Sequence, residues 1–188
     1  MSLPQLPPSA KLVISLLMAD KSLYGIAGKA LVQRFGPVDL ASSWLGFDYT
    51  DYYAPEMGKP LFRRMLAFKN PIRQEELPAV KLATNRMEQQ LAGDGKRRVN
   101  IDPGYLVMER FVLASGKNYS HRIYLGEGIY ADLTLLYQKK AFQKLPWTYP
   151  DYADTGITTF LEAVRKKYRF DLQLLPAGNS GAGSRETP

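Results

Sequence analysis

The chain has 188 residues, a net charge of +7 and no cysteine. This length suits one domain with short tails, and the lack of cysteine excludes disulfide frameworks, thiol catalysis and cysteine metal sites. The first residues lack the basic and apolar regions of a signal peptide. The longest apolar run, 12–19, is far shorter than the roughly 20 residues that cross a bilayer. We therefore expect a soluble, cytoplasmic protein with no membrane partner.

The basic charge alone is compatible with nucleic acid, anionic lipid or a phosphorylated ligand as a partner. The lysines and arginines form only pairs and triplets, such as 96–98 and 165–167. Because no run reaches five residues, the pattern favours a scattered basic surface.

Strand and helix patterns alternate through the first hundred residues. Residues 1–10 carry three prolines and are expected to form a flexible arm. The apolar run 12–18 predicts a buried strand, and a helix capped by Asp20 or Ser22 follows and stops at Gly36-Pro37. Further elements are expected at 44–47 (strand), 62–68 (strand), 77–91 (helix) and 99–101 (strand). This βαββαβ order predicts a ferredoxin-like core.

The second half is expected to extend that core with an antiparallel hairpin and a final helix. Strand patterns occupy 105–113, 119–125, 129–137 and 142–145, and the last helix begins near Asp154 or Thr155. The result is one α+β domain over residues 11–170. The glycine-rich tail, 176–188, is expected to be disordered, and it lacks the lysine of a phosphate-binding loop.

A hairpin is predicted at Leu-Gly-Glu-Gly-Ile, residues 125–129. If Leu125 faces Ile129, Arg122 faces Asp132 and Tyr124 faces Tyr130. One face is then apolar, with Ile123, Leu125, Ile129, Ala131 and Leu133, and the other carries Arg122, Tyr124, Tyr130, Asp132 and Thr134. The second face offers a forked donor and flat rings for an anion or a ring-shaped ligand. The alternative is an ordinary cross-strand ion pair beside core tyrosines.

His121 is the only histidine, which excludes multi-histidine metal sites and two-histidine phosphodiesterase chemistry. The hairpin register places it on the apolar face, as a half-buried structural side chain. The alternative is a general base, with Asp132, Asp102 or Asp151 as the orienting acid.

Three other segments hold clustered polar or aromatic side chains. Asp48 and Asp51 either bind a hard cation or cap a polar turn. The segment 102–105, Asp-Pro-Gly-Tyr, is predicted to be a turn. The segment 146–152 is aromatic and fixed by two prolines, so it forms either a binding wall or a lid over the sheet.

The predicted helix at 77–91 presents Lys81, Asn85 and Glu88 on one side. These side chains either point into a pocket or, as we favour, form a surface salt-bridge row.

Four strings resemble the DUF4416 family, namely FDYTDYY (47–53), VNIDPGYL (99–106), YSHRIYLGEGIYADLTL (119–135) and PWTYPDY (146–152). The resemblance covers about residues 10–168 and implies a bacterial protein of unknown function. It carries over no catalytic residue. Some members bear a GTP-binding label, but this chain has no GxxxxGK[ST] loop and no Asn-Lys-x-Asp segment.

The favoured hypothesis is a binding module for a small anionic or nucleotide-like ligand. Its expected site comprises Arg122, Tyr124, Tyr130, Asp132, Lys117, Asp102, Tyr105, Trp147, Tyr149, Asp151, Asp48 and Asp51. One alternative is a hydrolase or transferase that uses His121 and Asp132. Another is a weak nucleic-acid binder, although the Lys/Arg-Gly-Phe signature of RNA-recognition strands is missing. The sequence assigns no cofactor, resident metal or oligomeric state.

Overall fold

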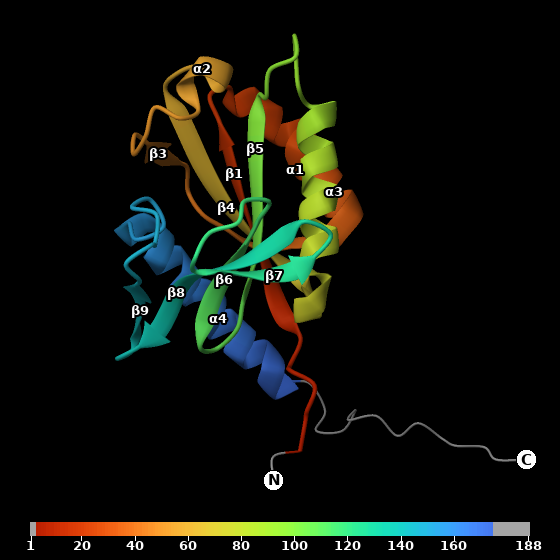
Figure 1. The fold of residues 1–188 in the computed structure, drawn as a ribbon, viewed down its shortest axis with the longest axis vertical. Helices are drawn as coiled ribbons and strands as arrows, with labels where there is room; N and C mark the ends of the chain where they lie inside the picture. The colour runs from red at the N-terminus through yellow and green to blue at the C-terminus, as the bar shows by residue number, and fades with distance from the viewer. Residues whose placement is uncertain (1–2, 175–188) are drawn as a thin grey trace, which may run out of the picture.

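The computed structural model describes residues 3–174, which form an α+β domain with one nine-stranded sheet and four α-helices (Figure 1). The strands are β1 (Ala10–Met18), β2 (Val38–Ala41), β3 (Leu45–Phe47), β4 (Leu61–Ile72), β5 (Val99–Leu106), β6 (Arg110–Ser115), β7 (Arg122–Gly126), β8 (Ile129–Gln138) and β9 (Ala141–Lys144). The helices are α1 (Tyr24–Phe35), α2 (Ala54–Met57), α3 (Leu77–Gln90) and α4 (Thr155–Leu174). The tail predicted at 176–188 lies outside the described residues.

All neighbouring strands are antiparallel, in the order β2-β4-β1-β5-β6-β8-β7, with β3 on β4 and β9 on β8. The predicted alternation of strands and helices in the first hundred residues is present, and β2 is a strand that the sequence did not indicate. The α+β class is therefore confirmed.

The helices lie on both faces of the sheet. Side chains of α1 and α3 pack on the face formed by Leu12, Ile14, Leu16 and Met18 of β1, and Figure 1 shows these two helices together on one side. Helix α4 packs on the opposite face through Ile157, Phe160, Leu161 and Val164. None of the helices within residues 3–174 is long and apolar enough to cross a membrane.

The sheet consists of two groups of strands joined by a short ladder. Only three residue pairs, from Gly104 to Leu106 of β5, connect β5 to β6. Along 99–103 the outer edge of β5 has no strand beside it, and side chains of α3 bond to the backbone of Ile101 instead. The N–H of Ile101 donates to Glu88 Oε1 at 2.5 Å, and its carbonyl accepts from Lys81 Nζ at 3.1 Å. Because β5 and β6 diverge here, the sheet opens beside 99–103.

The predicted turn at 102–105 is wrong, because these residues lie within β5. The single strand predicted at 105–113 is also wrong, since the chain turns between β5 and β6. A close strand contact accounts for the presence of Gly104 in β5, where a turn was predicted. A Cβ at this position would meet the carbonyl oxygen of Val112 well inside van der Waals contact, so the glycine allows β6 to approach β5.

The hairpin register is confirmed at Arg122–Asp132 and Tyr124–Tyr130, but the pairing of Leu125 with Ile129 is wrong. Gly126 faces Ile129, and Leu125 is an extra, bulged residue. The turn has two residues, Glu127 and Gly128, with φ of 54° and 74°. Two consecutive positive φ angles are typical of the tight type I′ hairpin turn.

Burial along the hairpin also departs from the predicted division into an apolar face and a polar face. Ile123, on the predicted apolar face, is 71% exposed, whereas Arg122 and Asp132 are 9% and 3% exposed. Arg122 is buried because the segment 146–152 packs beside it, with Tyr149 accepting a hydrogen bond from Arg122. Packing against this distant segment therefore decides which side chains of the hairpin are covered.

Candidate functional site

A cleft of about 600 Å³ lies where β5 and β6 diverge and is lined by residues of both groups of strands. Its charged lining residues are Arg63, Lys81, Arg97, Lys117, Arg122, Glu88, Asp102, Asp132 and Asp151. Its aromatic lining residues are Phe47, Tyr49, Tyr52, Tyr53, Tyr149 and Tyr152. The volume falls in the range of pockets that hold small organic ligands.

The structure brings half of the predicted site residues together at this cleft. Those that line it are Asp102, Lys117, Arg122, Asp132, Tyr149 and Asp151. The other six, Tyr105, Tyr124, Tyr130, Trp147, Asp48 and Asp51, do not line it, and neither does the candidate base His121. The four segments around 48–53, 102, 117–132 and 149–152 nevertheless converge on one cavity.

The tyrosines outside the cleft pack elsewhere in the domain. Tyr105 belongs to the hydrophobic core and is 8% exposed. Tyr124 and Tyr130 pair with each other across the hairpin, with ring centroids 5.2 Å apart. These rings stabilise the core and the hairpin.

Asp48 and Asp51 lie outside the cleft on an exposed loop, where both form ion pairs with Lys59. Within residues 3–174, no group of three or more histidine or carboxylate side chains is placed to hold a metal ion. The two aspartates therefore lie in an exposed turn and pair with a lysine.

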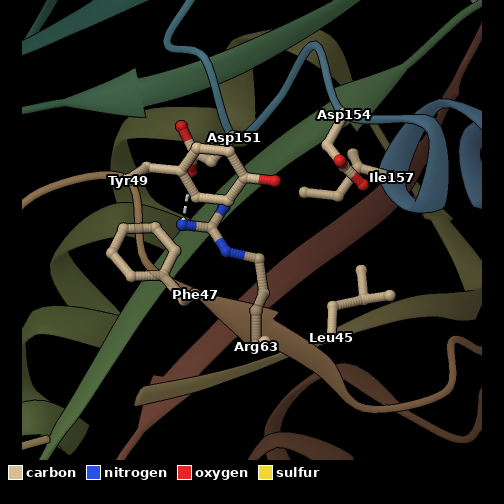
Figure 2. A pocket seen from close by; sticks show the side chains of 8 residues that line it. Leu45, Phe47, Tyr49, Arg63, Asp151, Asp154 and Ile157 are labelled. Atoms are coloured by element: carbon tan, nitrogen blue, oxygen red, sulfur yellow. Dashed lines mark ion pairs between the residues drawn. The ribbon is translucent and has the colours of Figure 1, made fainter. Parts of the chain in front are cut away.

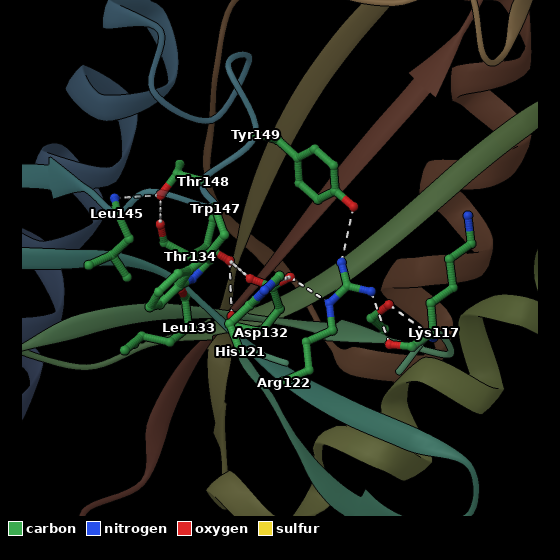
Figure 3. Close-up of polar contacts among 11 residues, drawn as sticks. Lys117, His121, Arg122, Asp132, Leu133, Thr134, Leu145, Trp147, Thr148 and Tyr149 are labelled. Atoms are coloured by element: carbon green, nitrogen blue, oxygen red, sulfur yellow. Dashed lines mark hydrogen bonds and ion pairs between the residues drawn. The ribbon is translucent and has the colours of Figure 1, made fainter. Parts of the chain in front are cut away.

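Arg122 is the centre of a hydrogen-bond network on one side of the cleft (Figure 3). Its Nε donates to Asp132 Oδ2 at 2.8 Å, its Nη1 to the carbonyl of Lys117 at 3.0 Å, and its Nη2 to the Tyr149 hydroxyl at 3.0 Å. The three bonds tie the hairpin, the loop after β6 and the segment 146–152 to one another. Arg122 thus holds the wall of the cleft in place, and its forked donor is already engaged.

His121 immediately precedes β7 and stacks on Trp147, with ring centroids 5.0 Å apart and an interplanar angle of 11°. Its Nε2 lies 3.5 Å from Asp132 Oδ2 (Figure 3). His121 does not line the cleft. The imidazole is therefore near an acid, as the general-base alternative requires, but it does not open into the cavity.

Arg63 of β4 and Asp151 form a buried ion pair, 2.6 Å between Nη2 and Oδ2 (Figure 2). The guanidinium also lies over the rings of Phe47 and Tyr152, at 5.0 and 4.7 Å. Burial raises the pKa of Asp151, although Arg63 acts in the opposite direction. The small cavity beside this pair, about 10 Å³, is too small for an organic ligand, so the larger cleft is the candidate site.

Arg63 was not among the predicted site residues, because the neighbouring Arg63 and Arg64 were interpreted as a basic cluster on the surface. A usable signal exists in β4, where Leu61, Arg63, Met65 and Ala67 alternate along the strand and all are buried. A charge at an inward position of such an alternation indicates a buried partner.

Lys81, Asn85 and Glu88 of α3 line the cleft. The favoured prediction that they form a surface salt-bridge row is therefore wrong. Lys81 is 8% exposed and donates to Asp102 at 3.3 Å. Asn100 donates to the other oxygen of Asp102, and Arg97 donates to the amide oxygen of Asn100 at 2.8 Å. This network makes the inner part of the cleft polar.

A family model described as "Domain of unknown function (DUF4416)" matches residues 8–168. The chain belongs to the DUF4416 family. The match spans every segment that lines the cleft and confirms the resemblance seen in the sequence. Neither the curated proteins nor the solved structures contain a match to this DUF4416 chain.

Glu88 of this DUF4416 domain makes its stability depend on pH in a predictable direction. Burial raises the pKa of Glu88, and this outweighs the opposing effects of Lys81 and the Ile101 N–H. A folded-state pKa above the unfolded value means that folding favours the protonated carboxyl. The stabilisation of the folded state that comes from this proton is present at low pH and is lost as the pH rises through the folded pKa. Relative to Glu88→Gln, the wild-type protein should become more stable as the pH falls from 7 towards 5.

Urea denaturation of both proteins at pH 5, 6 and 7 measures this difference. Glu162→Gln, at an exposed position of α4, controls for removal of a carboxylate. The raised pKa of Glu88 would be contradicted if the stability of the wild-type protein relative to Glu88→Gln stayed constant, or decreased, as the pH fell.

Proposed function

We propose that the DUF4416 cleft binds a small organic ligand that combines a ring or sugar with an anionic group, as nucleotides and sugar phosphates do. One observation carries the proposal: sequence segments far apart in the chain converge on a cavity of about 600 Å³ that is lined by tyrosines and cations. Such a combination provides flat contacts for a ring and donors for an anion.

We also infer that β1, α1, β2, β4, α3 and β5 form a ferredoxin-like unit. The strand order β2-β4-β1-β5 and the packing of α1 and α3 on one face support this inference. It matters for function because the helices leave the opposite face of β4 and β5 available to the cleft, where Arg63 and Asp102 lie.

The aromatic side of the cleft is ordered before any ligand arrives. The Tyr52 and Tyr53 rings pack edge to face with centroids 5.0 Å apart, and Tyr53 packs in the same way on Phe47 at 5.8 Å. Rings that are already fixed lose little conformational entropy when a ligand binds. We propose binding rather than a hydrolase or transferase reaction because the one histidine does not line the cavity.

A thermal-shift screen with nucleosides, nucleotides, sugar phosphates and short oligonucleotides tests the proposal. A ligand present at 100 times its Kd stabilises the folded state by about 2.7 kcal/mol, which corresponds to a Tm increase of roughly 5–10 °C for a domain of this size. Folded protein whose Tm no small ligand changes would contradict the proposal. Retention on oligonucleotides alone, at low salt, would favour the nucleic-acid alternative.

Two tyrosines provide a matched test of where the ligand lies. Tyr52 lines the cleft and Tyr124 does not, and both are 59% exposed. Tyr52→Ala should weaken binding about tenfold, as loss of an aromatic contact worth roughly 1.4 kcal/mol does. Tyr124→Ala should leave the affinity unchanged. Equal effects of the two substitutions, measured by calorimetry, would place the ligand outside the cleft.

A further inference from the structure

The cations of the cleft differ in whether a carboxylate already neutralises them. Four have such a partner, in the pairs Arg63–Asp151 (2.6 Å), Lys81–Asp102 (3.3 Å), Arg97–Glu56 (2.7 Å) and Arg122–Asp132 (2.8 Å). Across residues 3–174, no carboxylate lies within 4.0 Å of the ammonium group of Lys117. The cleft therefore offers one unneutralised positive charge.

The loop after β6 holds Lys117 in a defined position. Its backbone N–H donates to Ser115 Oγ at 3.1 Å, and its carbonyl accepts from Arg122 Nη1 at 3.0 Å. Its ammonium donates to the Tyr52 hydroxyl at 3.3 Å and lies 4.8 Å from the centroid of that ring. A lysine ammonium has three N–H donors, so two remain for a ligand. Lys117 itself is exposed, which places this charge at the rim of the cleft.

The inner part of the cleft has the opposite character. Glu88 has no cationic partner within 4.0 Å among the described residues, and one of its oxygens accepts from the N–H of Ile101. The carboxylates of Asp102 and Asp151 lie in the same lining, each already paired with a cation. A second anionic group on the ligand would meet acceptors here, whereas a hydroxyl or amino group would meet hydrogen-bond partners.

We infer that the ligand is a phosphate monoester of a nucleoside or sugar, whose phosphate binds Lys117 at the rim and whose uncharged part lies inward. This inference rests on the proposed function and narrows it to one anionic group. It implies that a monophosphate binds more tightly than the matching uncharged compound. It also implies that a triphosphate gains nothing further, because the cleft offers no second unneutralised cation to the additional phosphates.

Calorimetry at constant ionic strength with matched compounds tests this order. The series comprises a nucleoside with its 5′-monophosphate and 5′-triphosphate, and ribose with ribose 5-phosphate. A monophosphate should bind about 10- to 100-fold more tightly than its uncharged partner, the range that hydrogen bonds to a charged group give. A triphosphate that binds a further tenfold more tightly would overturn the inference.

Lys117→Gln should reduce the ratio of monophosphate to nucleoside affinity to about 1. Lys166→Gln removes the same charge from an exposed position of α4 outside the cleft and should preserve the ratio. A ratio that survives Lys117→Gln, or a wild-type protein that binds both compounds equally, would overturn this inference and leave the proposed function standing. Absence of binding to every compound would overturn both.

Discussion

Replacing Asp151 by Asn should lower the free energy of unfolding by about 3–5 kcal/mol, the usual cost of removing one partner from a buried ion pair. Arg63 is 3% exposed and Asp151 is 6% exposed, so water compensates little for the lost carboxylate. Two nitrogens of Arg63, Nε and Nη1, already have no hydrogen-bond partner within the described structure. The substitution would leave the whole guanidinium without a countercharge between the rings of Phe47 and Tyr152.

Urea denaturation measures this loss, and Asp48→Asn provides the control. Asp48 is almost fully exposed, so the same chemical change there should alter stability by less than about 0.5 kcal/mol. The double variant Arg63→Met/Asp151→Asn should be more stable than Asp151→Asn alone, since it also removes the uncompensated charge. This comparison holds even if Asp151→Asn folds poorly. A double variant that is no more stable than Asp151→Asn would show that the uncompensated charge of Arg63 does not cause the loss of stability.

Replacing Gly104 by Ala should destabilise the domain by about 1–3 kcal/mol, the cost of inserting a methyl group into a packed site. The loss should lie near the upper end of that range. The atom that the new Cβ meets is the backbone oxygen of Val112, which cannot move away without separating β5 from β6.

Gly46→Ala is the matched control for Gly104→Ala. Gly46 also lies in a strand, β3, and an added Cβ there meets no atom within 4 Å. This variant should be as stable as the wild-type protein or slightly more stable, because alanine restricts the unfolded chain. Equal Tm values for the two alanine variants would contradict the close approach of β5 and β6.

The elements with strong periodicity were predictable from the sequence. The apolar run of β1 and the stripes of α3 and α4 depend on local pattern, and their positions agree with the structure within a few residues. The segment 102–105 was wrongly predicted to be a turn because Pro-Gly dipeptides favour turns locally. In the structure, a glycine is needed at position 104 because another strand, β6, approaches it closely.

The candidate site was predictable only in part, for a similar reason. Strings rich in aspartate and tyrosine pointed to the segments that meet at the cleft, but local pattern does not distinguish Tyr52, which lines it, from Tyr124, which does not. Arg63 was missed because its partner, Asp151, is 88 positions away in a segment whose packing the sequence alone does not reveal.

The short ladder between β5 and β6 determines how the cleft can change its width. Because only the pairs from Gly104–Leu113 to Leu106–Phe111 join the two groups of strands, breathing of the cavity must strain those few hydrogen bonds. Those amide protons of 104–106 and 111–113 that bond across this ladder should therefore exchange with deuterium at a rate that reports on this movement. A ligand that bridges α3 and the loop after β6 should slow the exchange of these amides, even though it touches few of them.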